Sequence, residues 1–278
     1  MIPRISFSNI AWELSDEEAV ADLLGRAGLD AVDIAPGKYF SDLSVASRAD
    51  AERVRDWWRT RDFEILGMQA LLFGTQGLNL FSNETVRAAM LDRLTAVARV
   101  AGWMGARRLV FGSPKNRDRS GLTDDQAAEI AIPFFRTLGD RAMEHGVRFC
   151  LEPNPPRYAC NFMTTTDEGA AFVRTVDHPG VRLHVDAGTL SINHEDANLM
   201  ISAYRDLVGY IHICEPDLLP IATRNPIHSE LAIALSQWLP HMPLSIEMKA
   251  IPIAGLSSIV SAVRALYGSG SRTQEGES

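Results

Sequence analysis

The sequence predicts an α/β fold, a closed (β/α)8 barrel of the TIM type. The chain has 278 residues, which is close to the usual size of one such barrel. Short strand-like runs alternate eight times with longer amphipathic runs of helical period. Because this alternation continues without a second zone of composition, we expect one parallel sheet closed on itself and one domain over residues 1–268.

Each expected strand is short and mostly apolar, as parallel strands covered on both faces must be. Ser15 and Glu18 form a capping-box pattern before the first expected helix, and Asn83 and Thr123 precede long helical runs as N-caps. Residues 269–278 are polar and rich in glycine and serine, so we expect a disordered tail there. In chain order, the expected strands are Arg4–Ser8, Ala31–Ala35, Glu64–Phe73, Arg107–Gly112, Val147–Glu152, Val181–Asp186, Tyr210–Cys214 and Leu244–Met248.

The composition argues against nucleic-acid and membrane partners. The formal net charge is −8, whereas nucleic-acid binders usually carry a basic patch. No apolar run approaches the roughly 18 residues that span a bilayer. Cys150, Cys160 and Cys214 are too few for a disulfide framework, so reduced thiols and a cytoplasmic location are expected. Trp57 and Trp58 are expected to pack between helices or to form a homo-oligomer contact.

The last four expected strands each end in one ionisable residue: Glu152, Asp186, His212 or Glu247. Successive members of this set are separated by roughly 30 residues, the length of one strand-plus-helix unit, so their side chains should meet at the C-terminal rim, where active sites of this fold lie. Three carboxylates and an imidazole cannot be buried together unpaired, and a divalent cation would remove the conflict. Such oxygen-rich ligands predict Mn²⁺ or Mg²⁺, with Co²⁺, Fe²⁺ or Zn²⁺ as alternatives.

Further polar residues are expected at the same rim as substrate contacts. His184 lies two residues before Asp186 on the same strand face, as a substrate-facing group or a hydrogen-bonded core histidine. The charged residues after the fourth strand would bind an anionic or polyhydroxylated substrate, or form a solvated loop. The remaining candidates would touch substrate or serve only loop and helix structure. The complete set is Lys115, Asn116, Arg117, Asn154, His184, Glu215 and His228.

Four motifs at the strand ends resemble one known family. They are Leu151–Pro155, His184–Gly188, Ile211–Leu218 and Ser245–Met248. Over residues 4–267 the chain resembles the xylose isomerase-like superfamily of sugar-phosphate isomerases and epimerases. The motifs are specific for the superfamily and weak for the substrate.

The resemblance implies a mechanism. Glu152, Asp186, His212 and Glu247 match the family's metal ligands, and Glu152 and Glu247 also match two catalytic glutamates that work from opposite faces of the substrate. The metal would hold two adjacent oxygens of a sugar, sugar phosphate or related polyol ketone and acidify the C–H between them. One glutamate would remove the proton to give an enediolate, and its return to the other face or the next carbon would complete epimerisation or isomerisation. Thr189 stands where ketose epimerases usually have a histidine, which puts a plain ketose 3-epimerase in doubt.

A second departure from the family pattern also puts a plain ketose 3-epimerase in doubt, because the position near Leu218, which is usually an arginine in ketose epimerases, is apolar here.

Other functions remain in competition. A lyase or dehydratase acting on a keto-sugar, keto-inositol or sugar glycoside would use the same metal and proton abstraction. An endonuclease for abasic DNA would need more ligating histidines and a basic face, and the chain has seven His. A non-catalytic binding barrel is disfavoured because all four ligand positions are intact.

Overall fold

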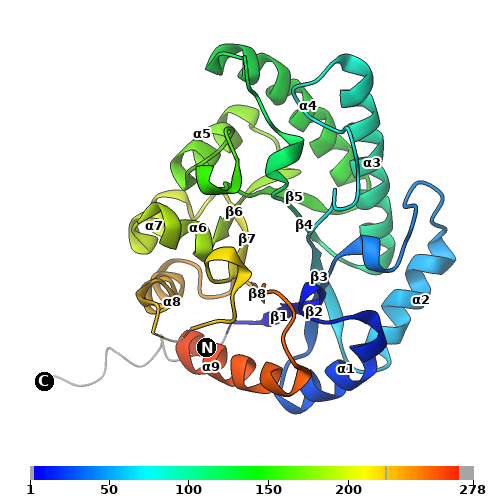
Figure 1. Cartoon of the computed structure of the whole chain (residues 1–278), viewed down its shortest axis with the longest axis vertical. Helices are drawn as coiled ribbons and strands as arrows, with labels where there is room; N and C mark the ends of the chain where they lie inside the picture. Colours follow the sequence, from blue (N-terminus) through cyan, green and yellow to red (C-terminus); the bar gives the residue numbers. More distant parts are fainter. Residues whose placement is uncertain (1–2, 223, 269–278) are drawn as a thin grey trace, which may run out of the picture.

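The chain forms a closed barrel of eight parallel strands in the order β1 to β8, as predicted (Figure 1). The computed structural model describes residues 3–222 and 224–268, so the expected tail at 269–278 lies outside the described residues. Strand β8 pairs with β1 and closes the ring. The strands are β1 Ile5–Ser8, β2 Ala31–Ile34, β3 Glu64–Met68, β4 Arg108–Phe111, β5 Arg148–Leu151, β6 Val181–Asp186, β7 Val208–Ile213 and β8 Leu244–Ile246.

Helices surround the barrel on its outside (Figure 1). Asn83 caps α3, and Thr123 forms a capping box with Gln126 at α4, as expected. The expected box at Ser15 is wrong, because the chain enters α1 through a short 3-10 turn and Asp16 precedes the helix without a side-chain cap. The helices are α1 Glu17–Arg26, α2 Arg48–Arg59, α3 Glu84–Met104, α4 Asp124–Glu144, α5 Thr166–Val176, α6 Ala187–Asn193, α7 Ala197–Tyr204, α8 Pro226–Trp238 and α9 Leu256–Gly268.

Strand β3 is shorter than expected. It ends at Met68, and Ala70 adopts a left-handed backbone conformation with φ of 55° that turns the chain out of the sheet. Leu71 and Leu72 are buried beyond that turn, whereas Phe73 is exposed. The expected strand was too long because it was extended on apolar character alone, and the residues after Met68 form a partly buried loop.

The barrel interior is more polar than is usual for this fold, where branched apolar residues dominate. Phe111 packs outward against Phe135 of α4, at a ring distance of 5.4 Å, so Arg108 and Val110 on the same strand face inward. Between β6 and β7, His184 pairs with Tyr210 and Asp186 pairs with His212. Alternation along the strands thus brings polar side chains into successive layers, and the uppermost layer forms the C-terminal mouth. No described helix is long and apolar enough to cross a bilayer.

Candidate metal centre

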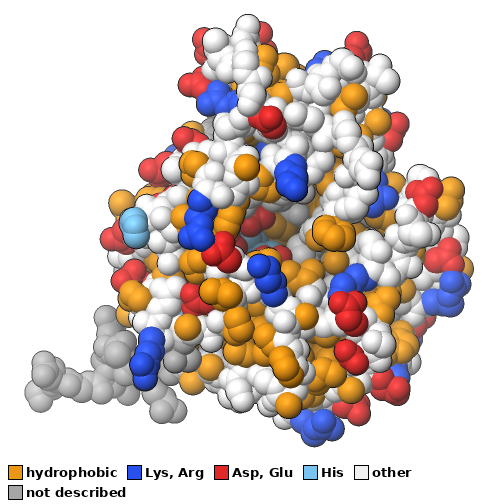
Figure 2. All heavy atoms as spheres, viewed as in Figure 1, with side chains coloured by type: hydrophobic (Ala, Val, Ile, Leu, Met, Phe, Trp, Pro, Cys, Tyr) orange, Lys and Arg blue, Asp and Glu red, His pale blue; other side chains and the backbone are white. Residues whose placement is uncertain are grey.

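A cavity of about 490 Å³ opens at the C-terminal ends of the strands, and Glu152, Asp186 and Glu247 line it. Figure 2 shows the hollow near the centre of this face, with acidic side chains in and beside it. The sheet's hydrogen bonding continues past the strand ends, because the Glu152 and Glu247 amides donate to Phe111 and Ile213 carbonyls, each at 3.0 Å. This continuation fixes where both glutamates leave the barrel.

Glycine at position 112, directly after β4, provides the space that the Glu152 carboxylate occupies. A Cβ atom placed on Gly112 would lie 2.1 Å from Oε2 of Glu152. Glu152 is half-buried in the cavity wall, where it is partly desolvated. This desolvation, followed by the charges of Asp186 and Glu247, raises the pKa of Glu152 to about 8.

His212 is fully buried on β7, and its Nδ1 lies 3.1 Å from Oε2 of Glu247. Its Nε2 is buried without a hydrogen-bond partner among the described residues. Burial opposes protonation of this imidazole, but the surrounding carboxylates, Glu247 first, outweigh it and raise the pKa of His212 to about 9. The Glu247 contact orients the ring and leaves Nε2 as a candidate metal ligand.

Asp186, the last residue of β6, is also the N-cap of α6. Its Oδ1 accepts a hydrogen bond from the Thr189 amide at 2.7 Å, and its Oδ2 accepts one from Sγ of Cys214 at 2.8 Å. Desolvation raises the pKa of Asp186, against the effect of the Cys214 hydrogen bond. Cys214, which the sequence suggested only as a buried thiol, thus orients a candidate metal ligand.

His184 lies one layer below His212, and their rings meet edge-to-face at a centroid distance of 4.2 Å. The ring is fully buried, and neither nitrogen has a partner among the described residues. Ligand atoms of His184, Asp186 and His212 lie within 4.8 Å of one another, a grouping able to hold a cation. His184 does not line the cavity, so this position does not support the substrate contact that the sequence suggested. The unpaired nitrogens equally do not fit a hydrogen-bonded core histidine.

Arg117 is completely buried behind the cavity wall. Its Nη2 donates to the Glu152 carbonyl at 2.7 Å and to Oδ1 of Asn154 at 2.8 Å. Asn154 is buried and lines the cavity, so Arg117 supports two residues of the wall. The predicted direct substrate contact of Arg117 does not agree with this burial, because its guanidinium already binds protein atoms behind the wall.

Lys115 and Asn116 are not among the residues that line the cavity, and their expected substrate contacts stay a prediction. Lys115 is exposed. Asn116 donates its side-chain amide to the Leu78 carbonyl at 2.7 Å and accepts from the Leu80 amide at 2.8 Å. The turn after β4 is therefore hydrogen-bonded to the loop that follows β3.

Glu215 lines the cavity, but the surrounding protein binds both of its carboxylate oxygens. Oε1 accepts from the Ala222 amide and lies 2.9 Å from Nε2 of His228, while Oε2 accepts from Nδ2 of Asn225 at 2.6 Å. His228 is fully buried, and its Nδ1 lies 3.0 Å from the Tyr267 hydroxyl. His228 therefore anchors the loop after β7, instead of reaching into the cavity as a substrate contact.

Sequence reasoning missed several residues on the cavity rim. Arg157 and Asp217, from the loops after β5 and β7, form an ion pair at 2.6 Å, and the Tyr158 hydroxyl accepts from the Asp217 amide at 2.7 Å. These contacts join the two loops beside the cavity. Lys249 is the basic side chain among the described lining residues. Thr189 donates its hydroxyl to the Pro153 carbonyl at 3.1 Å.

Comparisons with known proteins agree with the fold. The model of a family described as xylose isomerase-like TIM barrel matches residues 21–230. An L-ribulose 3-epimerase from Methylomonas sp. (strain DH-1) is 30% identical over 117 residues, which is 42% of this chain and 41% of that protein. The aligned segment thus spans less than half of that relative.

Solved structures extend the likeness over the whole barrel. A D-psicose 3-epimerase crystallised in the presence of D-fructose has a TM-score of 0.79 at 16% identity, covering 95% of this chain and 99% of that chain. A 3-keto-D-glucoside 4-epimerase from E. coli has a TM-score of 0.78 at 16% identity, with the same coverage of both chains. At these identities the likeness establishes the barrel fold.

Proposed function

The chain belongs to the xylose isomerase-like TIM barrel family, and from this premise we propose that it is a divalent-metal-dependent isomerase or epimerase of a sugar or related polyol ketone. The observation that carries the proposal is the grouping of Glu152, Asp186 and Glu247 around one cavity, beside the buried His212. The names of its relatives, an L-ribulose 3-epimerase and a D-psicose 3-epimerase, favour the same class of reaction.

The residues fit a divalent cation. His212 has a buried, unpartnered nitrogen, and desolvation keeps the pKa values of Glu152 and Asp186 raised. Glu152 and Glu247 line the cavity and His184 does not, so a cation accessible to substrate would be held by the two glutamates with Asp186 and His212. Nitrogen and oxygen ligands of this kind suit Mn²⁺ or Mg²⁺, with Co²⁺, Fe²⁺ or Zn²⁺ as alternatives. When bound, the cation would polarise a substrate carbonyl.

The two glutamates are assigned the proton transfers. They follow β5 and β8, the outer two of the four strands that carry the set, so a substrate between them presents one face to each. One glutamate removes the proton next to the carbonyl to give an enediolate. In epimerisation the other glutamate donates a different proton to the opposite face, and in isomerisation a proton is delivered to the next carbon. Arg117 positions Glu152 by donating a hydrogen bond to the Glu152 backbone carbonyl.

The charges around the cavity favour an uncharged substrate over a sugar phosphate. Acidic side chains dominate the lining, and Lys249 is the basic side chain among the described lining residues. A phosphate would meet repulsion there, whereas hydroxyl groups can donate to carboxylates. The three free cysteines fit the proposed cytoplasmic location.

The test is a screen of the metal-loaded protein against keto-sugars in D₂O, with products analysed by mass spectrometry and NMR. We expect deuterium at the carbon next to the carbonyl and an inverted or isomerised product. Replacing Glu152 or Glu247 by Gln should reduce turnover by about 10²–10⁴-fold, because each change removes a base. Exposed Glu129, replaced by Gln, is the control. Loss of a β-leaving group would instead identify a lyase, and near-normal turnover in both variants would refute the two-glutamate mechanism.

A further inference from the structure

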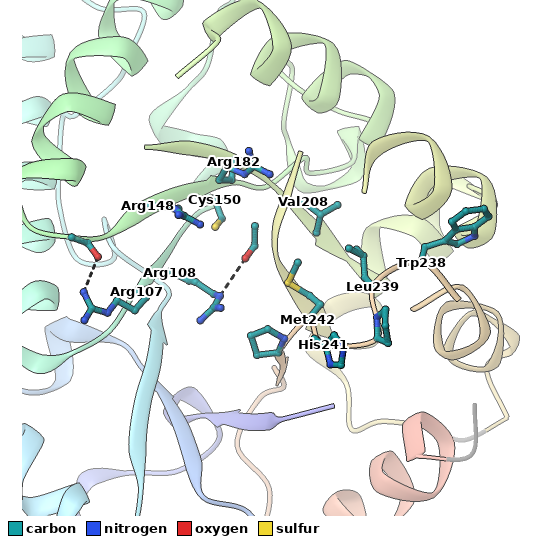
Figure 3. Close-up of a pocket in the computed structure, with 14 residues that line it drawn as sticks. Arg107, Arg108, Arg148, Cys150, Arg182, Val208, Trp238, Leu239, His241 and Met242 are labelled. Carbon is teal, nitrogen blue, oxygen red and sulfur yellow. Dashed lines mark hydrogen bonds between the residues drawn. The ribbon is translucent and has the colours of Figure 1, made fainter. Parts of the chain in front are cut away.

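A second cavity, of about 620 Å³, lies at the opposite end of the barrel, where β4, β5 and β6 begin. Figure 3 shows Arg108, Arg148 and Arg182 on its strand side, facing the segment that follows α8. The proposed catalysis does not use this cavity. It is lined by Arg107, Arg108, Gly146, Arg148, Cys150, Arg182, Val208, Gly209, Trp238, Leu239, Pro240, His241, Met242 and Pro243.

The strand register explains the gathering of arginines. Arg108 pairs with Arg148 across β4 and β5, and Arg182 pairs with Cys150 across β5 and β6. Arg108 and Arg148 therefore stand side by side, and Arg182 follows on the next strand, opposite Cys150. Desolvation, followed by the charge of Arg148, lowers the pKa of Arg182, so the two guanidiniums repel each other.

The protein supplies little countercharge for this cluster. Among the described residues, none of the four arginines forms an ion pair. Arg107 and Arg108 donate to the carbonyls of Gly146 and Gly209, at 3.0 and 3.3 Å, and Arg182 donates to the Asp206 carbonyl. Carbonyl groups orient guanidiniums without neutralising them. Arg108 also lies over the Tyr210 ring, 5.3 Å from its centroid, and the charge of Asp206 acts on Arg182, so the protein balances the positive charge only in part.

A buried acid beside the cluster keeps one carboxylate oxygen, Oδ2, without a hydrogen-bond partner among the described residues. Asp33, on β2, accepts hydrogen bonds through Oδ1 from the Ser6 hydroxyl at 2.7 Å and from the Tyr210 hydroxyl at 2.8 Å. Desolvation raises the pKa of the Asp33 carboxyl, and the positive charge of Arg108 is one of the effects that lower it. Asp33 does not line the cavity. It therefore leaves Arg148 and Arg182 for a ligand.

The wall opposite the arginines is largely apolar. Leu239 and Met242 lie on it, and His241 stands beside them (Figure 3). The Trp238 indole turns away from the cavity, because its Nε1 donates to Oδ1 of Asn198 at 3.0 Å and its ring lies against Arg205. The volume falls within the usual range for small-molecule sites, about 300–1,000 Å³. A cluster of guanidiniums suits the oxygens of a phosphate group, and the apolar wall suits the body of an organic molecule.

We propose that this cavity binds a phosphorylated small molecule, with its phosphate among Arg108, Arg148 and Arg182 and its body against Leu239 and Met242. The site is distinct from the candidate metal centre, because it lies at the other end of the barrel. The proposal stands independently of the proposed sugar chemistry. It assigns the chain a second ligand, an anion, beside a neutral substrate at the metal end.

The test is titration of the full-length protein with adenosine 5′-monophosphate, inorganic phosphate or adenosine, by calorimetry and tryptophan fluorescence. Adenosine 5′-monophosphate should bind most tightly, inorganic phosphate more weakly, and adenosine not measurably. Arg148→Ala and Arg182→Ala should each weaken the nucleotide about tenfold, because each removes a charged hydrogen-bond donor. Exposed Arg26→Ala is the matched control.

Titrations with and without a divalent metal distinguish this site from the candidate metal centre. Affinity should be the same with and without added Mn²⁺, and the arginine variants should keep metal binding. Removing one of two repelling charges should not lower the melting temperature, and Arg148→Gln serves if the alanine variant fails to fold. The proposal is overturned if the wild-type protein binds neither phosphate compound at 10 mM. It is also overturned if the arginine variants bind normally, or if inorganic phosphate binds as tightly as the nucleotide.

Discussion

Metal binding should release protons, and their number follows from two raised pKa values. Glu152 has a pKa of about 8 and His212 of about 9, so at pH 7 both groups are mostly protonated in the metal-free protein. Metal ligands must be deprotonated. A cation held by both residues should therefore displace close to two protons at pH 7.

The same values predict the pH dependence of affinity. Between pH 6 and 7, where both groups are protonated, the apparent affinity for Mn²⁺ should rise about a hundredfold per pH unit. The rise should fall to about tenfold per unit between the two pKa values and vanish above them. Calorimetry in buffers of different ionisation enthalpy counts the released protons directly.

Glu152→Gln should reduce the proton count by about one, because the amide holds no titrating proton, and exposed Glu129→Gln should leave it unchanged. The free energy of unfolding of the metal-free protein should also depend on pH, and it should fall as pH rises. The Glu152 contribution is complete below its ordinary pKa of 4.5 and is lost as pH rises through about 8. The His212 contribution is complete below 6.5 and is lost through about 9. The metal-free protein should thus melt at a lower temperature at pH 9 than at pH 7. Affinity that stays constant from pH 6 to 9, with no proton release, would refute this account.

Three further predictions concern the residues that shape the metal end. A chelator should lower the melting temperature of the metal-loaded protein, since a hundredfold excess over Kd stabilises by about 2.7 kcal/mol, and an unchanged curve would argue against a bound metal. Gly112→Ala places a Cβ 2.1 Å from the Glu152 carboxylate and should weaken metal binding and turnover, whereas Gly37→Ala, with no neighbour within 4 Å, should change neither. Cys214→Ala should weaken metal binding about 10–100-fold by removing the donor to Asp186, and Cys214→Ser should restore most of it; equal affinities in both variants would contradict this role.

The fold and the positions of four strand-end residues could be predicted because both follow from periodic signals. Glu152 and Glu247 stand where apolar runs end, and parallel pairing in a closed barrel carries such residues to one rim. Charge conflict then indicated a cation. The deeper position of His184 follows from the two-residue alternation of a strand, but its missing hydrogen-bond partners do not, because they depend on which side chains surround it.

The supporting contacts lie beyond such signals. Arg117 stands in a charged loop whose composition suggested exposure, yet the irregular backbone at Ser113, with φ of 27°, is followed by a turn in which Arg117 is buried. The Glu215–His228 contact joins residues of a loop and a helix, and only the folded path of the chain brings them together. Cys214 looked like a core residue because its thiol follows an apolar strand. Each of these contacts depends on tertiary packing, which local sequence patterns do not report.

The two ends of the barrel carry opposite charge, and this separation decides which ligand suits which end. Carboxylates dominate the C-terminal mouth, while Arg108, Arg148 and Arg182 stand at the N-terminal mouth. Without a cation, the acidic end repels anions and the basic end attracts them. A bound divalent cation would offset much of the acidic charge locally, which suits a neutral polyol ketone more than a phosphate ester. Because His184 and Tyr210 fill the barrel between the two mouths, a ligand at one end cannot reach the other, and any phosphate-dependent change in turnover would have to act through the strands themselves.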